Sequence, residues 1–170
     1  MSGESALSQV LSAIWFVLPA YFANGGALVL GGGRPLDLGR RLSDGRRILG
    51  DGVTIRGTLA GIAVGSATGG IQGLLAGTFV EGLSVGVAMG AGAMAGDMVG
   101  SFIKRRLNMS RGQPAPGLDQ VGFLVFALAF ASLVADIQVE TVVILLVLTP
   151  LIHVGTNVAA YLLGLKAVWY

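Results

Sequence analysis

Long apolar segments alternate with short polar ones along this chain of 170 residues. A membrane-spanning helix needs about 20 mostly apolar residues to cross a hydrocarbon core of roughly 30 Å. Five segments meet this requirement, at about residues 7–30, 57–79, 83–102, 118–135 and 139–165. The pattern predicts an all-α integral membrane protein with five transmembrane helices, which form a single membrane domain over residues 1–170.

The polar segments between them are of two kinds. Two long loops are expected at about residues 31–56 and 103–117, and a tight turn is expected near Glu81. A further short turn carries Asp136 and Glu140. A loop as long as the first one is usually functional or disordered in a compact protein.

Composition agrees with a membrane protein. Hydrophobic residues make up 54% of the chain and charged residues 12%, with a mean hydropathy of +0.78, whereas a soluble domain is about 25% charged. The absence of cysteine excludes disulfides, thiolate nucleophiles and Cys-ligated metals. The N-terminus lacks the basic region and cleavage site of a signal peptide, so the first apolar segment is expected to be retained.

All basic residues lie on one side of the predicted topology, in the two long loops and the C-terminal tail. They are Arg34, Arg40, Arg41, Arg46, Arg47, Arg56, Lys104, Arg105, Arg106, Arg111 and Lys166. The acidic residues Glu4, Glu81, Asp136 and Glu140 lie on the other side. The positive-inside rule then predicts cytoplasmic loops, a cytoplasmic C-terminus and an N-terminus outside.

Glycine recurs every fourth residue in the second and third apolar segments. The series are Gly57, Gly61, Gly65, Gly69, Gly73 and Gly77, then Gly82, Gly86 and Gly90, then Gly92, Gly96 and Gly100. This spacing predicts helices whose backbones approach closely. Space for a bulky substrate near Asp97 is a second interpretation.

Two aspartates flank the second polar loop, each near the end of an apolar segment. An ionised Asp97 or Asp119 at this depth is unfavourable unless it is paired or coordinating, which makes a functional site the first hypothesis. Two carboxylates beside Lys104, Arg105 and Arg106 suit Mg²⁺ bound together with a phosphate substrate. The alternative is a structural ion pair between Asp97 and Lys104 or Arg105.

The first polar loop combines glycine with arginine. Exposed backbone N–H groups can form an anion-binding concavity, and arginine forks match phosphate oxygens. The alternative is a solvated basic loop that contacts anionic lipid. The sequence GGGRP at residues 31–35 is not followed by Gly-Lys-Ser/Thr, which excludes a P-loop NTPase at the level of motifs.

A polar stripe is expected in the last apolar segment, where His153, Asn157 and Tyr161 are spaced by four residues. Hydrogen bonds between helices and contact with a substrate are both compatible with such a stripe. The role of these three residues is left open.

The segment around the two aspartates carries the spaced motif GD-x3-S-x2-KRR-x5-G-x3-P-x2-DQ. Its residues are Gly96, Asp97, Ser101, Lys104, Arg105, Arg106, Gly112, Pro116, Asp119 and Gln120. The motif resembles that of the archaeal CDP-archaeol synthases, relatives of the CDP-diacylglycerol synthases. The resemblance extends to PAYFAN (19–24), GGGRPLD (31–37), DGRRILGDGVTIRG (44–57) and the last apolar segment.

The chain departs from the related patterns in two places. Val53 stands where the family commonly has lysine, and the chain lacks the His-Gly-Gly and further acids of the longer bacterial signature. The residues that would complete a second metal site are therefore left open.

The resemblance implies a Mg²⁺-dependent cytidylyltransferase of the cell membrane, with its active site facing the cytoplasm. CTP and the ether lipid 2,3-bis-O-(geranylgeranyl)-glycerol 1-phosphate would give CDP-archaeol and pyrophosphate. The implied metal ligands are Asp97 and Asp119, and the implied catalytic residues are Asp97, Asp119, Lys104 and Arg105. Residues implied to bind the nucleotide and its phosphates are Asn24, Gly31, Gly32, Gly33, Asp37, Asp44, Arg46, Arg47, Asp51, Arg56 and Arg106.

Other classes of membrane protein fit the sequence less well. A transporter of an anionic solute usually shows repeated halves, which an odd number of spans without an internal repeat does not supply. A CDP-alcohol phosphotransferase would need an Asp-x3-Asp that is missing here, and a purely structural protein leaves the aspartates unexplained. The expected partners are CTP, a polyprenyl ether-lipid phosphate and the bilayer, without nucleic acid. The oligomeric state is left open.

Overall fold

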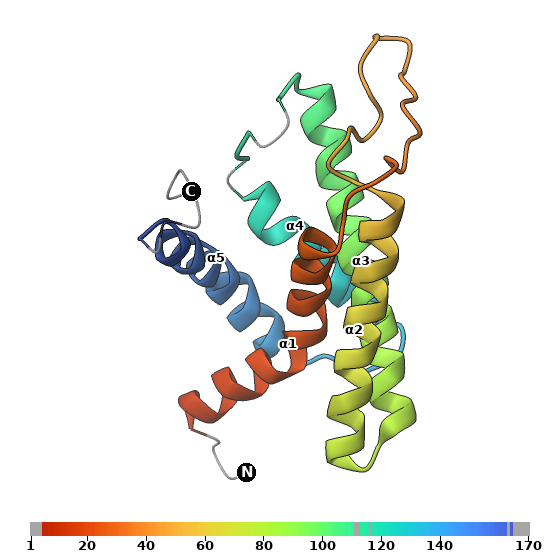
Figure 1. Cartoon of the computed structure of the whole chain (residues 1–170). Helices are drawn as coiled ribbons and strands as arrows, with labels where there is room; N and C mark the ends of the chain where they lie inside the picture. Colours follow the sequence, from red (N-terminus) through yellow and green to blue (C-terminus); the bar gives the residue numbers. More distant parts are fainter. Residues whose placement is uncertain (1–4, 111–112, 116, 163, 165–170) are drawn as a thin grey trace.

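The structure is a computed structural model that describes residues 5–110, 113–115, 117–162 and 164. This described part contains five helices and no β-strand (Figure 1). The helices are α1 (Ala6–Val29), α2 (Ile55–Ala76), α3 (Phe79–Arg106), α4 (Leu118–Ala131) and α5 (Val139–Leu162). The predicted all-α fold with five helices is confirmed.

The helices differ in length. Within the described residues, α1, α2 and α3 are each long and apolar enough to cross a membrane. Helix α4 has 14 residues, a length of about 21 Å, which is less than the hydrocarbon thickness. The predicted fourth segment continued to residue 135, but successive tight turns follow Ala131, where the N–H groups of Leu133 and Val134 bond to carbonyls three residues back.

The third helix is longer than predicted at both ends. It continues to Arg106, so Lys104, Arg105 and Arg106 lie in its last turn and not in the loop. Basic residues are good helix formers and are favoured at a helix C-terminus by the macrodipole. The turn predicted near Glu81 is also wrong, because it lies at Gly77, whose φ of +74° suits glycine.

Helix α1 is bent midway along its length (Figure 1), and Pro19 lies inside it. Proline has no N–H group, so the carbonyl of Trp15 loses its normal intrahelical donor. The side-chain amide of Gln72 in α2 donates to this carbonyl, at 2.6 Å. The bend is thus tied to α2 by a hydrogen bond that satisfies an otherwise free backbone acceptor.

The glycines bring α2 and α3 into backbone contact, as predicted. A Cβ atom added to Gly69 would lie 2.5 Å from Cα of Gly86, and one added to Gly82 would lie 2.5 Å from Cα of Gly73. A second glycine face of α3 meets α4, where a Cβ on Gly96 would lie 2.6 Å from Cα of Phe123. Side chains on these faces would push the helices apart, so glycine sets the spacing of α2, α3 and α4.

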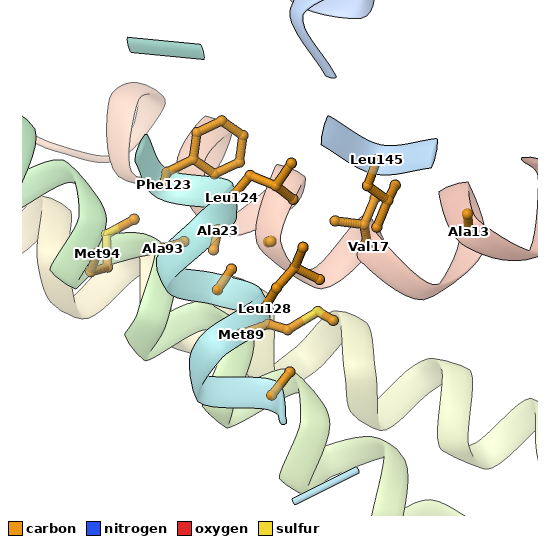
Figure 2. Packing of buried hydrophobic residues seen from close by; sticks show 13 residues of the cluster. Ala13, Val17, Ala23, Met89, Ala93, Met94, Phe123, Leu124, Leu128 and Leu145 are labelled. Atoms are coloured by element: carbon orange, nitrogen blue, oxygen red, sulfur yellow. The ribbon is translucent and has the colours of Figure 1, made fainter. Parts of the chain in front are cut away.

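The buried core lies where α1, α3, α4 and α5 meet. Figure 2 shows Leu145 of α5 facing Val17 of α1, and Met89 of α3 beside Leu128 of α4. Tyr21 of α1 adds a polar link, because its hydroxyl is 2.7 Å from that of Thr149 in α5. Helix α5 is therefore attached to the rest of the bundle through both α1 and α4.

The two polar loops lie at the same end of the bundle, as the topology predicted. The segment between α1 and α2 projects beyond the helices and lies beside the C-terminal end of α3 (Figure 1). It is not structureless, because isolated bridges join Pro35 to Thr54 and Arg41 to Arg47. At its base, the Ile55 N–H donates to the Arg34 carbonyl. This hairpin is called the first loop below.

Candidate active site

A polar cavity of about 240 Å³ lies between the first loop and the adjoining ends of α3 and α4. Helix α3 contributes Asp97, Ser101, Lys104 and Arg105 to its lining, and α4 contributes Asp119. The facing wall is the backbone of residues 49–53. The structure thus brings together all four residues predicted to be catalytic.

Helical spacing explains the α3 side of the cavity. Asp97, Ser101 and Lys104 are separated by four and three residues, so their side chains share one face of the helix. Arg105 lies beside them, and its Nε atom is buried without an acceptor among the described residues. A buried donor of this kind is unfavourable until an acceptor arrives. The Nε of Arg106 is also unpaired, but only Arg105 lines the cavity, where an anionic ligand could supply the acceptor.

Asp119 lies in the first turn of α4, where a negative charge is favoured by the helix dipole. One carboxylate oxygen accepts from the N–H of Ala115 at 2.9 Å, and the other forms an ion pair with the ammonium group of Lys104. This ion pair joins the end of α3 to the start of α4 across the second polar loop.

Asp97 differs from Asp119 in having no partner. It is half-buried, and among the described residues it accepts no hydrogen bond and forms no ion pair. The alternative of a structural ion pair with Lys104 or Arg105 is therefore not found, since Lys104 pairs with Asp119. Its carboxylate is left available for a ligand.

A second cavity of about 220 Å³ adjoins the first, because Asp97, Gly52 and Val53 line both. It lies between α1, α2 and α3, and Asn24, Leu28, Thr58 and Met94 complete much of its lining. Polar and apolar side chains are mixed there. Asn24, a predicted site residue, therefore lines the same cavity as Asp97.

A third cavity, of about 470 Å³, is lined by three more predicted residues, Gly31, Gly32 and Gly33, together with Asp51, which also lines the first cavity. Thr54 lines the second and third cavities. Its hydroxyl accepts from the N–H groups of Gly32 and Gly57 at 3.2 and 3.0 Å.

Other predicted binding residues do not line these cavities. Asp37 is buried inside the first loop and bonds to Arg47 through Oδ1 and Nη2 at 2.6 Å. Arg106 donates to the carboxylate of Asp44 at 2.6 Å and to the carbonyl of Arg47, while Arg46 donates to the carbonyl of Arg106. Arg56 is exposed in the first turn of α2.

The contacts of these loop residues shift their pKa values. Burial by itself would raise the pKa of Asp37, but hydrogen bonds from Arg47 and from three backbone N–H groups outweigh it and hold the pKa well below its usual range. The pKa of Arg47 is raised mainly by the bond to Asp37. A backbone N–H from Arg46 lowers the pKa of Asp44, with help from Arg106.

Sequence reasoning gave no role to three residues that the structure places at the cavities. Ser101 lines the first, Thr58 the second and Val53 both. Ser101 belongs to the spaced motif, and its position one turn after Asp97 is the signal that identifies it. Nothing in the sequence singles out Thr58. Of the polar stripe in α5, neither His153 nor Tyr161 lines these cavities, and the side chain of Asn157 lies outside the described residues.

Carboxylates and basic groups in a cavity at one end of an apolar helix bundle define an integral membrane protein with a site for an anionic substrate. Comparison with known proteins identifies the family. The profile of the CarS-like CDP-archaeol synthases matches residues 6–170. The chain belongs to the CDP-archaeol synthase family, and it is a nucleotidyltransferase of membrane lipid biosynthesis.

Individual relatives agree. The chain is 51% identical to the CDP-archaeol synthase of Pyrococcus horikoshii, with 95% of this chain and 98% of the relative covered. It is 56% identical to that of Methanothermobacter thermautotrophicus, with 95% of each chain covered. A solved structure of an intramembrane enzyme for archaeal membrane lipids biosynthesis has a TM-score of 0.80 and 46% identity, covering 87% of this chain and 94% of that one. Family membership decides against a transporter and a CDP-alcohol phosphotransferase.

Proposed function

We propose that this protein transfers a cytidylyl group from CTP to 2,3-bis-O-(geranylgeranyl)-glycerol 1-phosphate, giving CDP-archaeol and pyrophosphate. The observation that carries the proposal is the first cavity, where two aspartates and two basic side chains converge at the end of an apolar bundle. A soluble nucleotide and a membrane-bound phosphate can meet only at such a boundary. The choice of substrates is supported by the relatives named above, which are CDP-archaeol synthases.

The triphosphate of CTP would bind in the first cavity. Lys104 and Arg105 are the basic side chains of its lining, and the unpartnered Nε of Arg105 supplies a donor. Neutralising the triphosphate is the main task of a protein in phosphoryl and nucleotidyl transfer, because the reaction needs positioning and charge stabilisation more than covalent help.

The two aspartates fit Mg²⁺ bound together with the nucleotide. Mg²⁺ prefers hard oxygen ligands and is commonly held by one or two carboxylates plus substrate phosphates. Asp97 has a free carboxylate and Asp119 lies in the same cavity, while no group of three or more acidic or histidine side chains among the described residues is placed to hold a metal alone. When bound, Mg²⁺ would stabilise the negative charge that develops on the leaving pyrophosphate.

The lipid headgroup would enter from the second cavity. Its mixed lining includes Asn24 and Thr58, which can bond to a glycerol phosphate, and Leu28 and Met94, which suit the first carbons of the chains. Asp97 lines both cavities, so the phosphate of the lipid would meet the nucleotide there. The isoprenoid chains would stay in the hydrocarbon beside the helices.

The bonds of the reaction follow from this arrangement. A phosphate oxygen of the lipid attacks the α-phosphorus of CTP, and the bond from that phosphorus to the β-phosphate oxygen breaks. Pyrophosphate leaves with the electron pair of that bond. Lys104 and Arg105 hold the departing phosphates, which lowers the barrier by balancing their charge.

The active site would face the cytoplasm. The first loop, the first turn of α2 and the last turn of α3 carry the described basic residues at one end of the bundle, and basic residues mark the cytoplasmic side of membrane proteins. CTP is a cytoplasmic nucleotide, so this orientation places the polar cavity on the side of its soluble substrate.

The test is transfer of label from CTP to the ether-lipid phosphate by the purified protein with Mg²⁺. We expect labelled lipid and release of pyrophosphate, lost on chelation and in Asp97→Asn and Asp119→Asn. Release of CMP in place of pyrophosphate would contradict the reaction, and turnover that survives chelation would contradict the metal assignment. A correctly folded protein that transfers no label from intact substrates would overturn the proposal.

A further inference from the structure

The first loop contains one carboxylate that is more buried than its surroundings. The side chain of Asp37 is 1% exposed, although most of its neighbours in residues 36–46 are exposed. A buried carboxylate in a loop is unfavourable unless its oxygens are fully paired. The contacts of Asp37 therefore show which parts of the loop its carboxylate stabilises.

Asp37 accepts five hydrogen bonds from four residues. Oδ2 accepts from the backbone N–H groups of Leu49 and Gly50, both at 3.0 Å, and from Nε of Arg47 at 3.2 Å. Oδ1 accepts from Nη2 of Arg47 at 2.6 Å and from the N–H of Gly39 at 3.1 Å. Its acceptor capacity is used up within the loop, so nothing remains to coordinate a metal or a nucleotide.

Two of these donors begin the wall of the first cavity. Leu49 and Gly50 line it and lead directly into Asp51, Gly52 and Val53, which line it as well. Gly50 is buried with φ at +87°, and a Cβ added there would lie 3.4 Å from Cδ of Arg105. The backbone at Gly50 thus packs against the stem of a basic side chain that faces the cavity.

The far end of the same wall is fixed separately. The N–H of Leu36 donates to the carbonyl of Val53 at 2.9 Å, and Thr54 is held by its bonds to Gly32 and Gly57. Residues 49–53 are therefore anchored by Asp37 at one end and by the base of the hairpin at the other. Arg47 adds a link along the wall, because its Nη1 donates to Asp51 at 2.8 Å.

We propose that Asp37 is a positioning residue for the transfer reaction, which holds the 49–53 wall against Arg105 and so shapes the nucleotide cavity without touching the substrate. This inference rests on the proposed function for its kinetic consequence only. The effect of Asp37 on the backbone of residues 49–53 does not depend on the proposed function, because it can be measured in the protein without ligands.

Asp37→Asn is the informative variant. It keeps the size of the side chain but replaces one acceptor oxygen by an NH₂ donor, which faces donors on Arg47 or on the backbone. We expect hydrogen exchange of the amides in residues 49–51 to accelerate and KM for CTP to rise by at least about tenfold, the equivalent of one charge-assisted hydrogen bond. The value of kcat should fall by less, because the reacting groups are untouched.

Two further variants complete the design. Asp44→Asn makes the same chemical change in the same loop, at an exposed carboxylate that bonds to Arg106, and should leave exchange at residues 49–51 unchanged. Arg47→Met removes two of the five bonds to Asp37 and the bond to Asp51 but leaves the three backbone bonds to Asp37, so it should give an effect of the same kind. It also provides the test if Asp37→Asn does not fold.

The outcomes are distinct. Unchanged exchange and unchanged KM in both Asp37→Asn and Arg47→Met would overturn the inference. Normal exchange with a collapse of kcat in Asp37→Asn would mean that the carboxylate acts directly on the substrate, which also overturns it. If the unmodified protein does not turn over CTP, the proposed function fails, and exchange in the ligand-free full-length protein still decides whether Asp37 orders the wall.

Discussion

The cavity face of α3 and the first loop opposite it both carry aspartates and basic residues, but these charged side chains differ in whether they have partners. In the loop, Asp37, Asp44 and Asp51 each bond to an arginine. In the cavity, Lys104 pairs with Asp119, whereas Asp97 has no hydrogen-bond or ion-pair partner among the described residues and Arg105 keeps an unpaired Nε. Paired charges determine the shape of the loop, whereas unpaired ones are available to a ligand.

The difference follows from where each carboxylate lies on the backbone. In the loop, turns at Gly39, Gly45 and Gly50, all with positive φ, direct backbone N–H groups toward nearby carboxylates. On α3 the backbone donors are used within the helix, so Asp97 cannot bond to them. A helical acid near the membrane interface therefore depends on another element or a ligand for its partner.

The largest effect is expected from Asp97→Asn. The change removes a free carboxylate proposed to hold Mg²⁺, and turnover should fall by about a hundredfold or more. Thermal stability should stay the same or rise, because no ion pair is lost with the charge. Turnover and melting temperature in the same detergent check both parts. A melting temperature that falls as activity is lost would show that Asp97 has a structural role after all.

Lys104→Met sharpens the contrast between the two cavity aspartates. The ammonium group neutralises Asp119 in the ligand-free protein, so its removal should strengthen Mn²⁺ binding without nucleotide. It should also raise KM for CTP by about tenfold, because one triphosphate contact is lost. Metal titration by electron paramagnetic resonance and steady-state kinetics measure these opposite changes. Weaker Mn²⁺ binding would show that Lys104 does not compete with metal at Asp119.

The sequence predicts the helices better than it predicts the site. Hydrophobic length identifies five helices, and glycine spacing correctly predicts that helix backbones approach closely, since both signals are local. The short α4 is missed because Leu133, Val134 and Ala135 continue the apolar pattern after the helix ends. Hydropathy does not register a change from helix to turns.

Within the site, residue types are predictable but partners are not. The spaced motif places Asp97, Asp119, Lys104 and Arg105 in one cavity, as expected. Which aspartate pairs with Lys104 depends on the approach of α4 to α3, which a single sequence does not specify. In the same way, Asp37 cannot be told from a ligand-binding acid until the backbone at Leu49 and Gly50 is seen to turn toward it.

The charge of Asp37 gives the loop a defined dependence on pH. Its pKa lies below the usual range in the folded protein, so its contribution to loop stability is complete above the ordinary value of about 3.9 and is lost as the pH falls through the lower, folded value. Protection of the amides in residues 49–51, corrected for intrinsic exchange, should be constant from about pH 7 to 5. Loss of protection within that range in the unmodified protein would mean that the carboxylate already takes up a proton there.

The smallest effect is expected where a paired carboxylate is exposed. Asp44→Asn weakens the bond to Arg106 at a side chain that is 40% exposed, and such pairs contribute little because water screens them. We expect KM for CTP to change by less than about twofold. Arg106→Met should raise KM for CTP more than Asp44→Asn does. Arg106 also donates to the Arg47 carbonyl, and its Cζ atom lies 5.2 Å from the centre of the Phe102 ring. Kinetics on both variants test this order. If Asp44→Asn has the larger effect, the acid contacts the nucleotide directly, and the division between a shaping loop and a binding cavity fails at that residue.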